Sequence, residues 1–341
     1  MLAKTSETAC DDAFPPNLKV AAEASIDLSV IVCTANRADD LAFMLREFAK
    51  LDFPPDRTVE LVVVDNGSTD DTKMVIQRAR SFLPLPVIYV YEPTRGLSRA
   101  RNTGLTHCRG SIIAWTDDDC VASKDWLACI LKHFDDDRTL TMLGGRVELY
   151  DNTLYPVSIN PSLVPYRVSD TNVFPGSVLY GCNMAFRRHL VTRIGPFDIR
   201  LGAGTPLRAA EDADYVYRAH KAGYEVAYTP DVVIYHNHHR RSSAEAFRVR
   251  QSYAFSDGAF LAKHFISGDL CALKFFYWRL WNLLASNTAK ERSLIFHMFA
   301  GTVAFVMVAF SRSARTAILQ VAGHRFRVSR MRIWRLPTIC K

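Results

Sequence analysis

The sequence of 341 residues is 49% hydrophobic and 23% charged, and it has a formal net charge of +7. This length accommodates one large α/β domain with an appendage or two modest domains, and the hydrophobic fraction excludes a disordered chain. Eight cysteines are present without a CxxC pair or a histidine at ligand-like spacing, so the sequence indicates neither a zinc site nor a disulfide framework.

The positive charge is concentrated at the C-terminal end. Twelve Lys and Arg residues but only one acidic residue, Glu291, follow residue 269. The preceding residues carry 30 basic and 34 acidic side chains, so the body of the chain is slightly acidic. A basic tail of this kind favours an anionic surface, either nucleic acid or membrane.

Residues 1–26 are expected to form an extension before the first regular element. They lack a basic start followed by an apolar core and a cleavage site, so no secretory signal is predicted. A cytosolic catalytic face is the expectation that follows.

Four short runs rich in apolar and β-branched residues predict strands, at 28–34, 59–65, 87–92 and 111–116. Segments with helical periodicity or with turn residues leading into a helix separate these runs. Strands that alternate with helices predict an α/β fold, with a doubly wound, mostly parallel sheet covered by helices on both faces.

In such a sheet, ligands bind beyond the carboxyl ends of the strands. Polar residues follow each predicted strand, and the sheet would gather them at one edge: Thr34, Asn36, Arg37, Asp65, Arg95, Asp117, Asp118 and Asp119.

After residue 150 the alternation becomes less regular. The Pro-rich segment 154–168 predicts a loop over the site, 176–188 another strand, and 211–224 a helix. A final strand pair is expected around YEVAYTP and VVIYHNHH.

The run Asp117–Asp119 has two interpretations. Acidic clusters are commonly solvated turns, and the second such run, Asp135–Asp137, follows a helical pattern in a polar stretch and fits that description. The first run instead ends a buried strand at the predicted ligand edge, where a divalent cation would relieve the repulsion between carboxylates. Hard oxygen ligands suit Mg²⁺ or Mn²⁺, which commonly bridge a diphosphate.

Three further groups also leave alternatives open. Glu211 and Asp212 open a helix, where acids are favoured by the macrodipole without any chemistry, or one of them is a general base. His236 either completes a metal site or ends a strand in solvent. Arginines in PTRGLSRARNTGL, including Arg101, would meet phosphates or form a solvated helix face. No dinucleotide fingerprint, P-loop or nucleophile elbow is present.

Six segments in this order resemble glycosyltransferase family 2, whose members have the GT-A fold. They are LSVIVCTANRADDLAFML, VELVVVDNGSTDDT, RGLSRARNTGL, IIAWTDDDC, GCNMAFRR, and GPFDIRLGAGTP with EDADYVYRAHKAGYEVAYTPDVVIYHNH. The resemblance covers roughly residues 27–240. It implies an inverting transfer of a sugar from a nucleoside diphosphate donor to an acceptor hydroxyl, aided by Mg²⁺ or Mn²⁺.

The resemblance also assigns roles to residues. It implies that Thr34, Asn36 and Arg37 line the nucleotide pocket and that Asp65 meets the nucleotide base. Asp117 and Asp119 match the two acids of the DxD motif, with Asp119 as the metal ligand and His236 as the histidine that reaches the metal. Asp212 matches the general base. Arg101 and Asp118 are grouped with the donor nucleotide, and Gly181, Asn183 and Glu211 with the acceptor or a loop beside it.

The chain departs from processive members of the family, because it lacks the QxxRW motif and the multi-span channel of polysaccharide synthases. One transfer per encounter, in the synthesis of a cell-surface glycan or polysaccharide, is therefore expected. The resemblance ends near residue 240, so we expect an α/β domain over 27–240 and a helical, basic region over 241–341.

The C-terminal region contains the apolar segment 294–310, which is marginal for a membrane span and is equally compatible with a buried helix. Arginines interleaved with apolar residues in HRFRVSRMRIWRL favour a peripheral position on the inner face of the cell membrane, with a glycan or lipid-linked acceptor. No nucleic-acid partner is expected. The rival hypotheses are a nucleotidyltransferase acting on a sugar phosphate and a non-catalytic protein that binds nucleic acid or membrane.

Overall fold

The computed structural model describes residues 26–170 and 178–310. Up to Phe305 the described residues belong to one compact unit, and residues 306–310 belong to a second unit whose other members are not described. The expected N-terminal extension and the arginine-rich segment near residue 330 lie outside the described residues. The six cysteines within the described part are free thiols.

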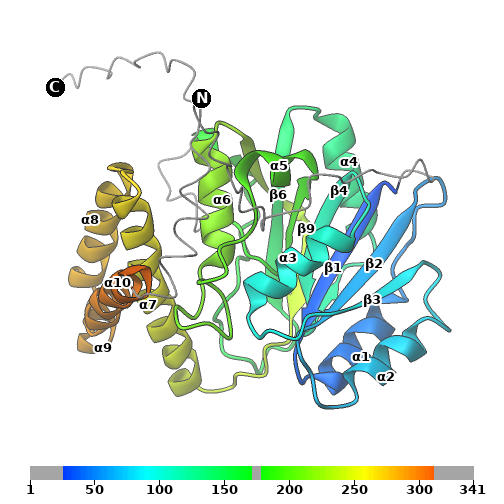
Figure 1. The fold of residues 1–341 in the computed structure, drawn as a ribbon, viewed down its shortest axis with the longest axis horizontal. Helices are drawn as coiled ribbons and strands as arrows, with labels where there is room; N and C mark the ends of the chain where they lie inside the picture. The colour runs from blue at the N-terminus through cyan, green and yellow to red at the C-terminus, as the bar shows by residue number, and fades with distance from the viewer. Residues whose placement is uncertain (1–25, 171–177, 311–341) are drawn as a thin grey trace, which may run out of the picture. The chain divides into compact units, whose positions relative to one another are not determined.

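The N-terminal half is the predicted alternation of strands and helices (Figure 1). Its strands pair in parallel in the order β3-β2-β1-β4, with Thr34 opposite Asp65 and Cys33 opposite Asp117. The strand ends therefore bring these polar residues to one edge, as the sequence predicts. The elements are β1 Leu28–Thr34, α1 Ala38–Phe48, β2 Val59–Asp65, α2 Thr72–Ala79, β3 Val87–Tyr91, α3 Leu97–His107 and β4 Ile112–Asp117.

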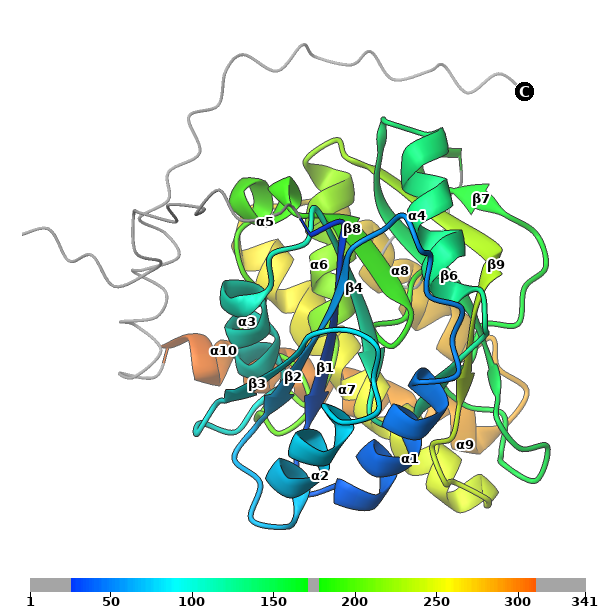
Figure 2. The ribbon, with the colours of Figure 1, turned by 90° about the vertical axis from the view of Figure 1, so that its right-hand side faces the viewer.

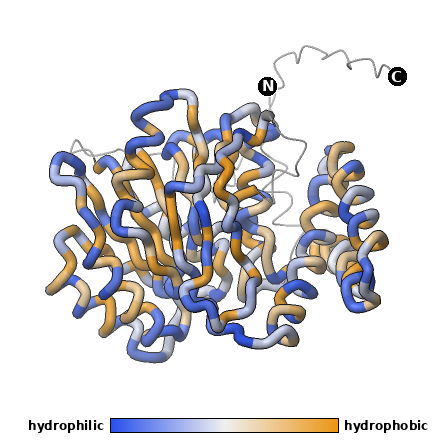
Figure 3. Tube along the Cα trace, turned by 180° about the vertical axis from the view of Figure 1, so that it is seen from behind, coloured by the Kyte–Doolittle hydropathy of each residue, from blue (hydrophilic) through white to orange (hydrophobic). Residues whose placement is uncertain are grey.

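Helices cover both faces of the sheet, as expected for a doubly wound fold. On one face, α1, α2 and α4 pack on alternate strand residues such as Val30 and Val63. On the other face, α3, α5 and α6 pack on the intervening residues such as Ile31 and Val64. Figure 3 shows the hydrophobic residues concentrated along the strands between these layers. Successive side chains of a strand point to opposite faces of the sheet, so each buried strand contributes to two hydrophobic cores, one on each face.

Beyond β4 the sheet becomes mixed. β8 is antiparallel to both β4 and β6, β9 is parallel to β6, and β5 and β7 pair antiparallel with β9. The elements of this half are β5 Cys120–Ala122, α4 Trp126–Asp136, β6 Leu140–Leu149, β7 Tyr166–Arg167, the 3₁₀ turn Val168–Asp170, β8 Met184–Arg187, α5 His189–Ile194, α6 Glu211–Lys221 and β9 Glu225–His236.

The prediction of a strand pair at residues 224–230 and 232–239 is wrong, because the structure has one long strand there, β9, with an interruption. Its register against β6 shifts between Thr229 and Val233. Pro230 lies in the interruption and cannot donate to the ladder. The interrupted backbone presses on β6, where a Cβ added to Gly145 would lie 2.1 Å from the carbonyl oxygen of Val232.

The C-terminal helices, as far as Phe305, belong to the same compact unit as the sheet (Figures 1 and 2). They are α7 Ser243–Ile266, α8 Cys271–Leu284, α9 Ala289–Arg292 and α10 Leu294–Phe310. α7 begins with a capping box between Ser242 and Glu245. Close crossing of α7 and α10 requires two glycines, since a Cβ on Gly258 would lie 1.8 Å from the Met298 carbonyl oxygen and one on Gly301 1.7 Å from that of Phe255.

Candidate active site

A cleft of about 840 Å³ lies at the carboxyl ends of β1 and β4. Its walls come from these strand ends, the start of α3, the segments 179–182 and 203–213, the end of β9, and helices α7 and α8. Eleven of the residues predicted from the sequence line it: Thr34, Arg37, Arg95, Arg101, Asp117, Asp118, Asp119, Gly181, Glu211, Asp212 and His236.

Asp118 and Asp119, directly after β4, are buried and partly neutralised by one arginine. Asp118 accepts a hydrogen bond from the Thr34 hydroxyl at 2.7 Å and an ion pair from Arg37 Nη1 at 3.0 Å. Arg37 Nη2 reaches Asp119 Oδ2, also at 3.0 Å. Burial raises the pKa of Asp118 to about 7, although the charge of Arg37 opposes this shift. Two buried carboxylates therefore share one arginine at this end of the cleft.

His236 faces Asp119 because β5 pairs with the end of β9, which places Cys120 opposite His236. His236 Nε2 lies 3.5 Å from Asp119 Oδ1, and Nδ1 contacts the Ser158 carbonyl oxygen at 3.2 Å. Burial opposes charge on both groups, yet their mutual hydrogen bond and attraction hold the pKa of Asp119 below its usual range and raise that of His236 to about 9.

A divalent cation fits this pair. Ligand atoms of Asp119, Cys120 and His236 all lie within 4.8 Å of one another. A carboxylate oxygen and an imidazole nitrogen are suitable ligands for Mn²⁺. The second ring nitrogen of His236 is already held by a backbone carbonyl, which fixes the ring orientation as in ordinary metal sites.

Asp65 and Asn36 lie beside the cleft, outside its lining residues, and organise the loops after β1 and β2. Asp65 accepts from the Ser68 amide at 2.8 Å and from the Tyr89 hydroxyl at 3.0 Å. Asn36 has a positive φ of 56° and accepts from the Thr69 amide at 2.8 Å. The two loops are therefore tied together at the end of the cleft where the resemblance locates the nucleotide.

The two acids that open α6 have different surroundings. Glu211 is buried, and Arg101 Nη1 lies 3.2 Å from its carboxylate. Arg101 lies 5.5 Å from the centre of the Trp115 ring, so its charge is held inside the protein. Burial raises the pKa of Glu211, and Arg101 opposes the shift. Glu211 therefore serves mainly to hold Arg101.

Asp212 faces the cleft, and its carboxylate orientation is fixed by two backbone donors. The Gly181 amide lies 2.8 Å from Oδ2 and the Ala213 amide 2.8 Å from Oδ1. A Cβ on Gly181 would lie 2.5 Å from Arg101 Nη2 and 3.1 Å from Asp212 Oδ2. The glycine therefore lets the backbone approach the carboxylate closely.

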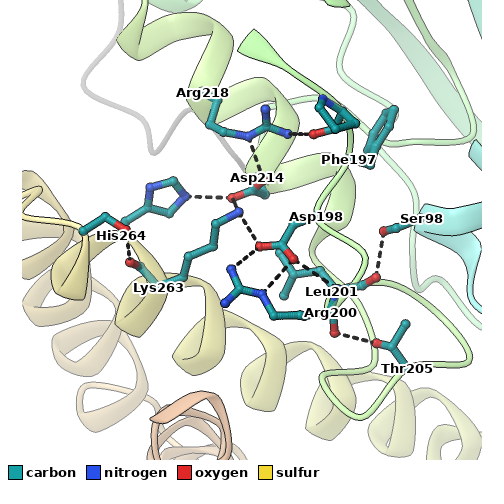
Figure 4. Close-up of polar contacts among 12 residues, drawn as sticks. Ser98, Phe197, Asp198, Arg200, Leu201, Thr205, Asp214, Arg218, Lys263 and His264 are labelled. Carbon is teal, nitrogen blue, oxygen red and sulfur yellow. Dashed lines mark hydrogen bonds and ion pairs between the residues drawn. The ribbon is translucent and has the colours of Figure 1, made fainter. Parts of the chain in front are cut away.

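A buried ionic cluster anchors α6 from behind (Figure 4). Lys263 on α7 reaches Asp214 on α6 at 2.6 Å and Asp198 in the preceding loop at 2.8 Å. His264 and Arg218 also contact Asp214, at 2.8 and 2.9 Å. Burial opposes ionisation, but these cations hold the pKa of Asp214 and of Asp198 below the usual range. Through Lys263, α7 thus fixes α6, which carries Asp212, and the loop that precedes α6.

Asn183 lies beneath the cleft and does not line it. Its amide nitrogen donates to the carbonyls of Arg146 and Val232, each at 2.9 Å, and its oxygen accepts from Trp126 Nε1 at 3.0 Å. The side chain thus has a full set of partners within the protein. The GCNMAFRR motif alone could not show this, because these partners come from β6, β9 and α4.

Sequence reasoning missed Asn66 and the whole wall formed by α7 and α8. Asn66 binds the segment between β3 and α3, donating to Thr94 O at 2.7 Å and accepting from the Gly96 amide at 2.8 Å. On α7, the Tyr253 hydroxyl lies 2.7 Å from Oγ of Ser158, the residue whose backbone carbonyl holds His236. An asparagine directly after the second strand was a usable signal for Asn66, whereas nothing in the sequence links α7 to the site.

Comparison with known proteins identifies relatives of this arrangement. A family model described as glycosyl transferase family 2 matches residues 29–195. The succinoglycan biosynthesis protein ExoM of Rhizobium meliloti is 26% identical over 62% of this chain and 67% of its own length. The glycosyltransferase AglE of Haloferax volcanii is 27% identical over 60% of this chain and 65% of its own length. The chain thus spans about two thirds of the length of these two curated relatives.

Solved structures share the fold. The mannosyltransferase PcManGT from Pyrobaculum calidifontis, in complex with GDP-Man and Mn²⁺, has a TM-score of 0.53 and 24% identity, and the match covers 87% of this chain and 79% of that one. Residues 1–349 of TarS from Staphylococcus aureus have a TM-score of 0.52 and 19% identity, with coverage of 84% and 73%. At this level of identity the likeness concerns the fold alone.

Proposed function

Because this chain belongs to glycosyltransferase family 2 and has the GT-A fold, we propose that it moves one sugar from a nucleoside diphosphate-sugar to an acceptor hydroxyl, with inversion at the anomeric carbon. The observation that carries the proposal is the common cleft of Asp212 and the Asp119–His236 pair. The cleft brings together a candidate general base and a pair of candidate metal ligands. These are the groups that would assist a single displacement at the anomeric carbon.

Asp212 is the proposed general base. Its backbone partners hold the carboxylate in one orientation, so it accepts the proton of an acceptor hydroxyl as that oxygen attacks. Attack from the side opposite the leaving diphosphate inverts the anomeric carbon. Glu211 does not compete for this role, because Arg101 occupies its carboxylate.

Asp119 and His236 would hold Mg²⁺ or Mn²⁺. The cation, when bound, stabilises the negative charge that develops on the departing diphosphate. Asp117 and Asp118 border the same space, and Thr34 and Arg37 orient Asp118 and Asp119 there. Asn36 and Asp65 shape the adjoining loops for the nucleotide.

The relatives suggest a setting in glycan synthesis. ExoM is named for succinoglycan biosynthesis, and TarS of Staphylococcus aureus is named as a poly(ribitol-phosphate) β-N-acetylglucosaminyltransferase; the latter is 30% identical over 48% of this chain and 30% of its own length. We place this chain in cell-surface glycan or polysaccharide synthesis, making one transfer per encounter at the inner face of the membrane. The segment Ala289–Phe310 is long and apolar enough to cross a membrane, which by itself is weak support.

The test is a panel of nucleoside diphosphate-sugars with and without Mn²⁺, read as thermal stabilisation of the full chain. A donor that stabilises only with the cation is then offered to candidate acceptors, and the product is analysed for anomeric configuration. We expect Asp212→Asn to lower kcat by about 10²–10⁴-fold while the Mn²⁺-dependent stabilisation persists.

The matched control is Asp231→Asn, an exposed aspartate remote from the cleft lining. Release of pyrophosphate in place of a nucleoside diphosphate would show a nucleotidyltransferase. Normal turnover by Asp212→Asn would remove the assigned base.

A further inference from the structure

The side of the cleft formed by α7, α8 and the turn before α6 contains arginines that lack acidic partners. Arg208 and Arg240 line the cleft, and neither has a carboxylate partner among residues 26–170 and 178–310. By contrast, Arg37 and Arg101 in the same cleft are each paired with a carboxylate. Uncompensated guanidinium groups at a cleft wall are suited to an anionic ligand, and phosphate is one of the groups that they bind in bidentate geometry.

The backbone imposes the position of Arg208. Arg208 has a φ of 71°, and so does Ala210, the residue immediately before α6. This conformation is uncommon for residues other than glycine and persists only where the surrounding structure holds it. The Arg208 guanidinium lies 4.0 Å from the centre of the Phe255 ring on α7. The turn that leads to Asp212 therefore also presents an arginine against α7.

α8 forms part of this wall and also an exposed apolar surface. Phe275, Trp278 and Arg279 line the cleft. Tyr277 and Trp281 are 66% and 71% exposed, and Trp278 is both exposed and part of the cleft. Together with Leu270, Leu273 and Leu284 they form what we call the α8 surface. The mouth of the cleft is therefore continuous with an apolar helix face.

α10 extends the α8 surface. The centre of its Phe299 ring lies 5.7 Å from that of Phe276 on α8, and Phe296 and Val303 are exposed. Soluble monomers seldom expose an apolar area that spans two helices unless it binds something.

The positive charge of α8, α9 and the sequence that follows them favours a lipid bilayer as the occupant of this surface. Lys274 lies on α8, and Lys290 and Arg292 lie on α9, the next helix along the chain. In the sequence, the 31 residues that follow α10 contain eight Lys and Arg residues and no acid. A second copy of so basic a surface would be repelled, whereas an anionic bilayer attracts the charges and accepts the aromatic side chains.

We propose that the acceptor is a membrane lipid that carries its sugar through a phosphate or diphosphate, which Arg208 and Arg240 bind. The hydrocarbon chain leaves the cleft past Trp278, along the α8 surface that rests on the bilayer. The inference deepens the proposed function, because an acceptor in this position would meet Asp212.

The test uses the full chain and measures vesicle binding, so it needs no sugar transfer. Sedimentation compares phosphatidylcholine vesicles, the same vesicles with phosphatidylglycerol, and the same vesicles with a few per cent of polyprenyl diphosphate. EDTA is present throughout, so that a diphosphate cannot bind through a cation at Asp119. We expect polyprenyl diphosphate to raise binding at least about tenfold over phosphatidylcholine alone, as two charge-assisted contacts predict.

Two variants separate the parts of the proposal. Arg208→Ala with Arg240→Ala should abolish the increase due to polyprenyl diphosphate and retain most binding to phosphatidylglycerol. Tyr277→Asp with Trp281→Asp should weaken both the increase due to polyprenyl diphosphate and the binding to phosphatidylglycerol vesicles. Arg193→Ala, an exposed arginine of α5 outside the cleft, is the matched control and should behave as the wild type.

Three results would overturn the inference. The first is equal binding to vesicles with and without polyprenyl diphosphate, and the second is an unchanged increase in the double arginine variant. The third is a dimer in light scattering that the α8 substitutions dissociate, which would assign the surface to a second copy. Displacement by inorganic pyrophosphate at the same concentration as the lipid would show a free phosphate site in place of a lipid site. Loss of transfer in the donor panel would instead count against the proposed function and leave these measurements intact.

Discussion

The chain contains three consecutive aspartates twice, at Asp117–Asp119 and at Asp135–Asp137, and the two runs behave differently. In the second run each carboxylate has its own cation on the surface: Arg57 for Asp135, Lys132 for Asp136 and Arg167 for Asp137. In the first run a single arginine, Arg37, bridges Asp118 and Asp119. Burial raises the pKa of Asp118 to about 7, whereas the hydrogen bond from Arg167 holds that of Asp137 below the usual range.

Position in the fold causes this difference. The first run follows a buried central strand, so it enters a cleft with little solvent. The second ends α4 at the surface, where water and flexible side chains neutralise each acid. Identical residues are thus a candidate cation site in one place and an ordinary solvated helix end in the other.

The largest expected effect comes from removing one acid of each run. Asp119→Ala should lower kcat/KM for transfer by about 10³-fold, or about 4 kcal/mol in the barrier, because the leaving diphosphate loses its cation. It should also abolish the Mn²⁺-dependent thermal stabilisation by the donor. Asp136→Ala, the matched change in the second run, should alter neither. Activity of Asp119→Ala within tenfold of the wild type would contradict the comparison.

Asp198 and Asp214 form a third kind of acid group, buried and neutralised by cations of the chain itself. Lys263→Met removes the cation that the two carboxylates share, and we expect a loss of about 3 kcal/mol in the free energy of unfolding. Added Mn²⁺ should not restore the lost free energy of unfolding. Urea denaturation measures the change, and Lys132→Met, at the solvated second run, is the control that should leave stability unchanged. A Lys263→Met protein as stable as the control would show that Arg200, which pairs with Asp198, and Arg218 and His264, which contact Asp214, suffice.

The sequence predicts the half of the fold that local patterns determine. Strands β1 to β4 each combine a β-branched run with turn residues, and their order follows from the alternation with helices. The edge where Thr34, Asp65 and Asp117 meet follows from that topology. These predictions needed no contact between distant parts of the chain.

The remainder depends on such contacts. Strand β6 was missed because Gly144 and Gly145 interrupt its apolar pattern, and the reason for Gly145 is a carbonyl of β9 far along the chain. The role of α7 was missed for the same reason, since Lys263 reaches Asp214 across 49 residues. The resemblance could place Asn183 near the acceptor, but only the packing of β6, β9 and α4 shows that its side chain is occupied.

Arg37 and Arg57 test whether the first run needs a cation. Arg37→Gln leaves Asp118 without a cation and Asp119 with His236 alone, and we expect a loss of about 1–2 kcal/mol because the arginine is itself partly exposed. Mn²⁺ should then raise the melting temperature more than it does for the wild type. Arg57→Gln should cost less than about 1 kcal/mol and show no response to Mn²⁺. An equal response to Mn²⁺ in the two variants would remove the distinction between the runs.

The smallest expected effect is the pH dependence of the second run. The pKa of Asp137 is held below its usual range in the folded protein, so its ionised form stabilises the fold at pH values above the unfolded pKa of about 4 and this contribution disappears as the pH falls through the folded pKa. Asp137→Asn should therefore be less stable than the wild type by about 0.5–1 kcal/mol at neutral pH. The difference should shrink below pH of about 4. Thermal unfolding of the two proteins across this range measures it, and a difference that grew on acidification would mean that Asp137 is better accommodated protonated, as Asp118 is.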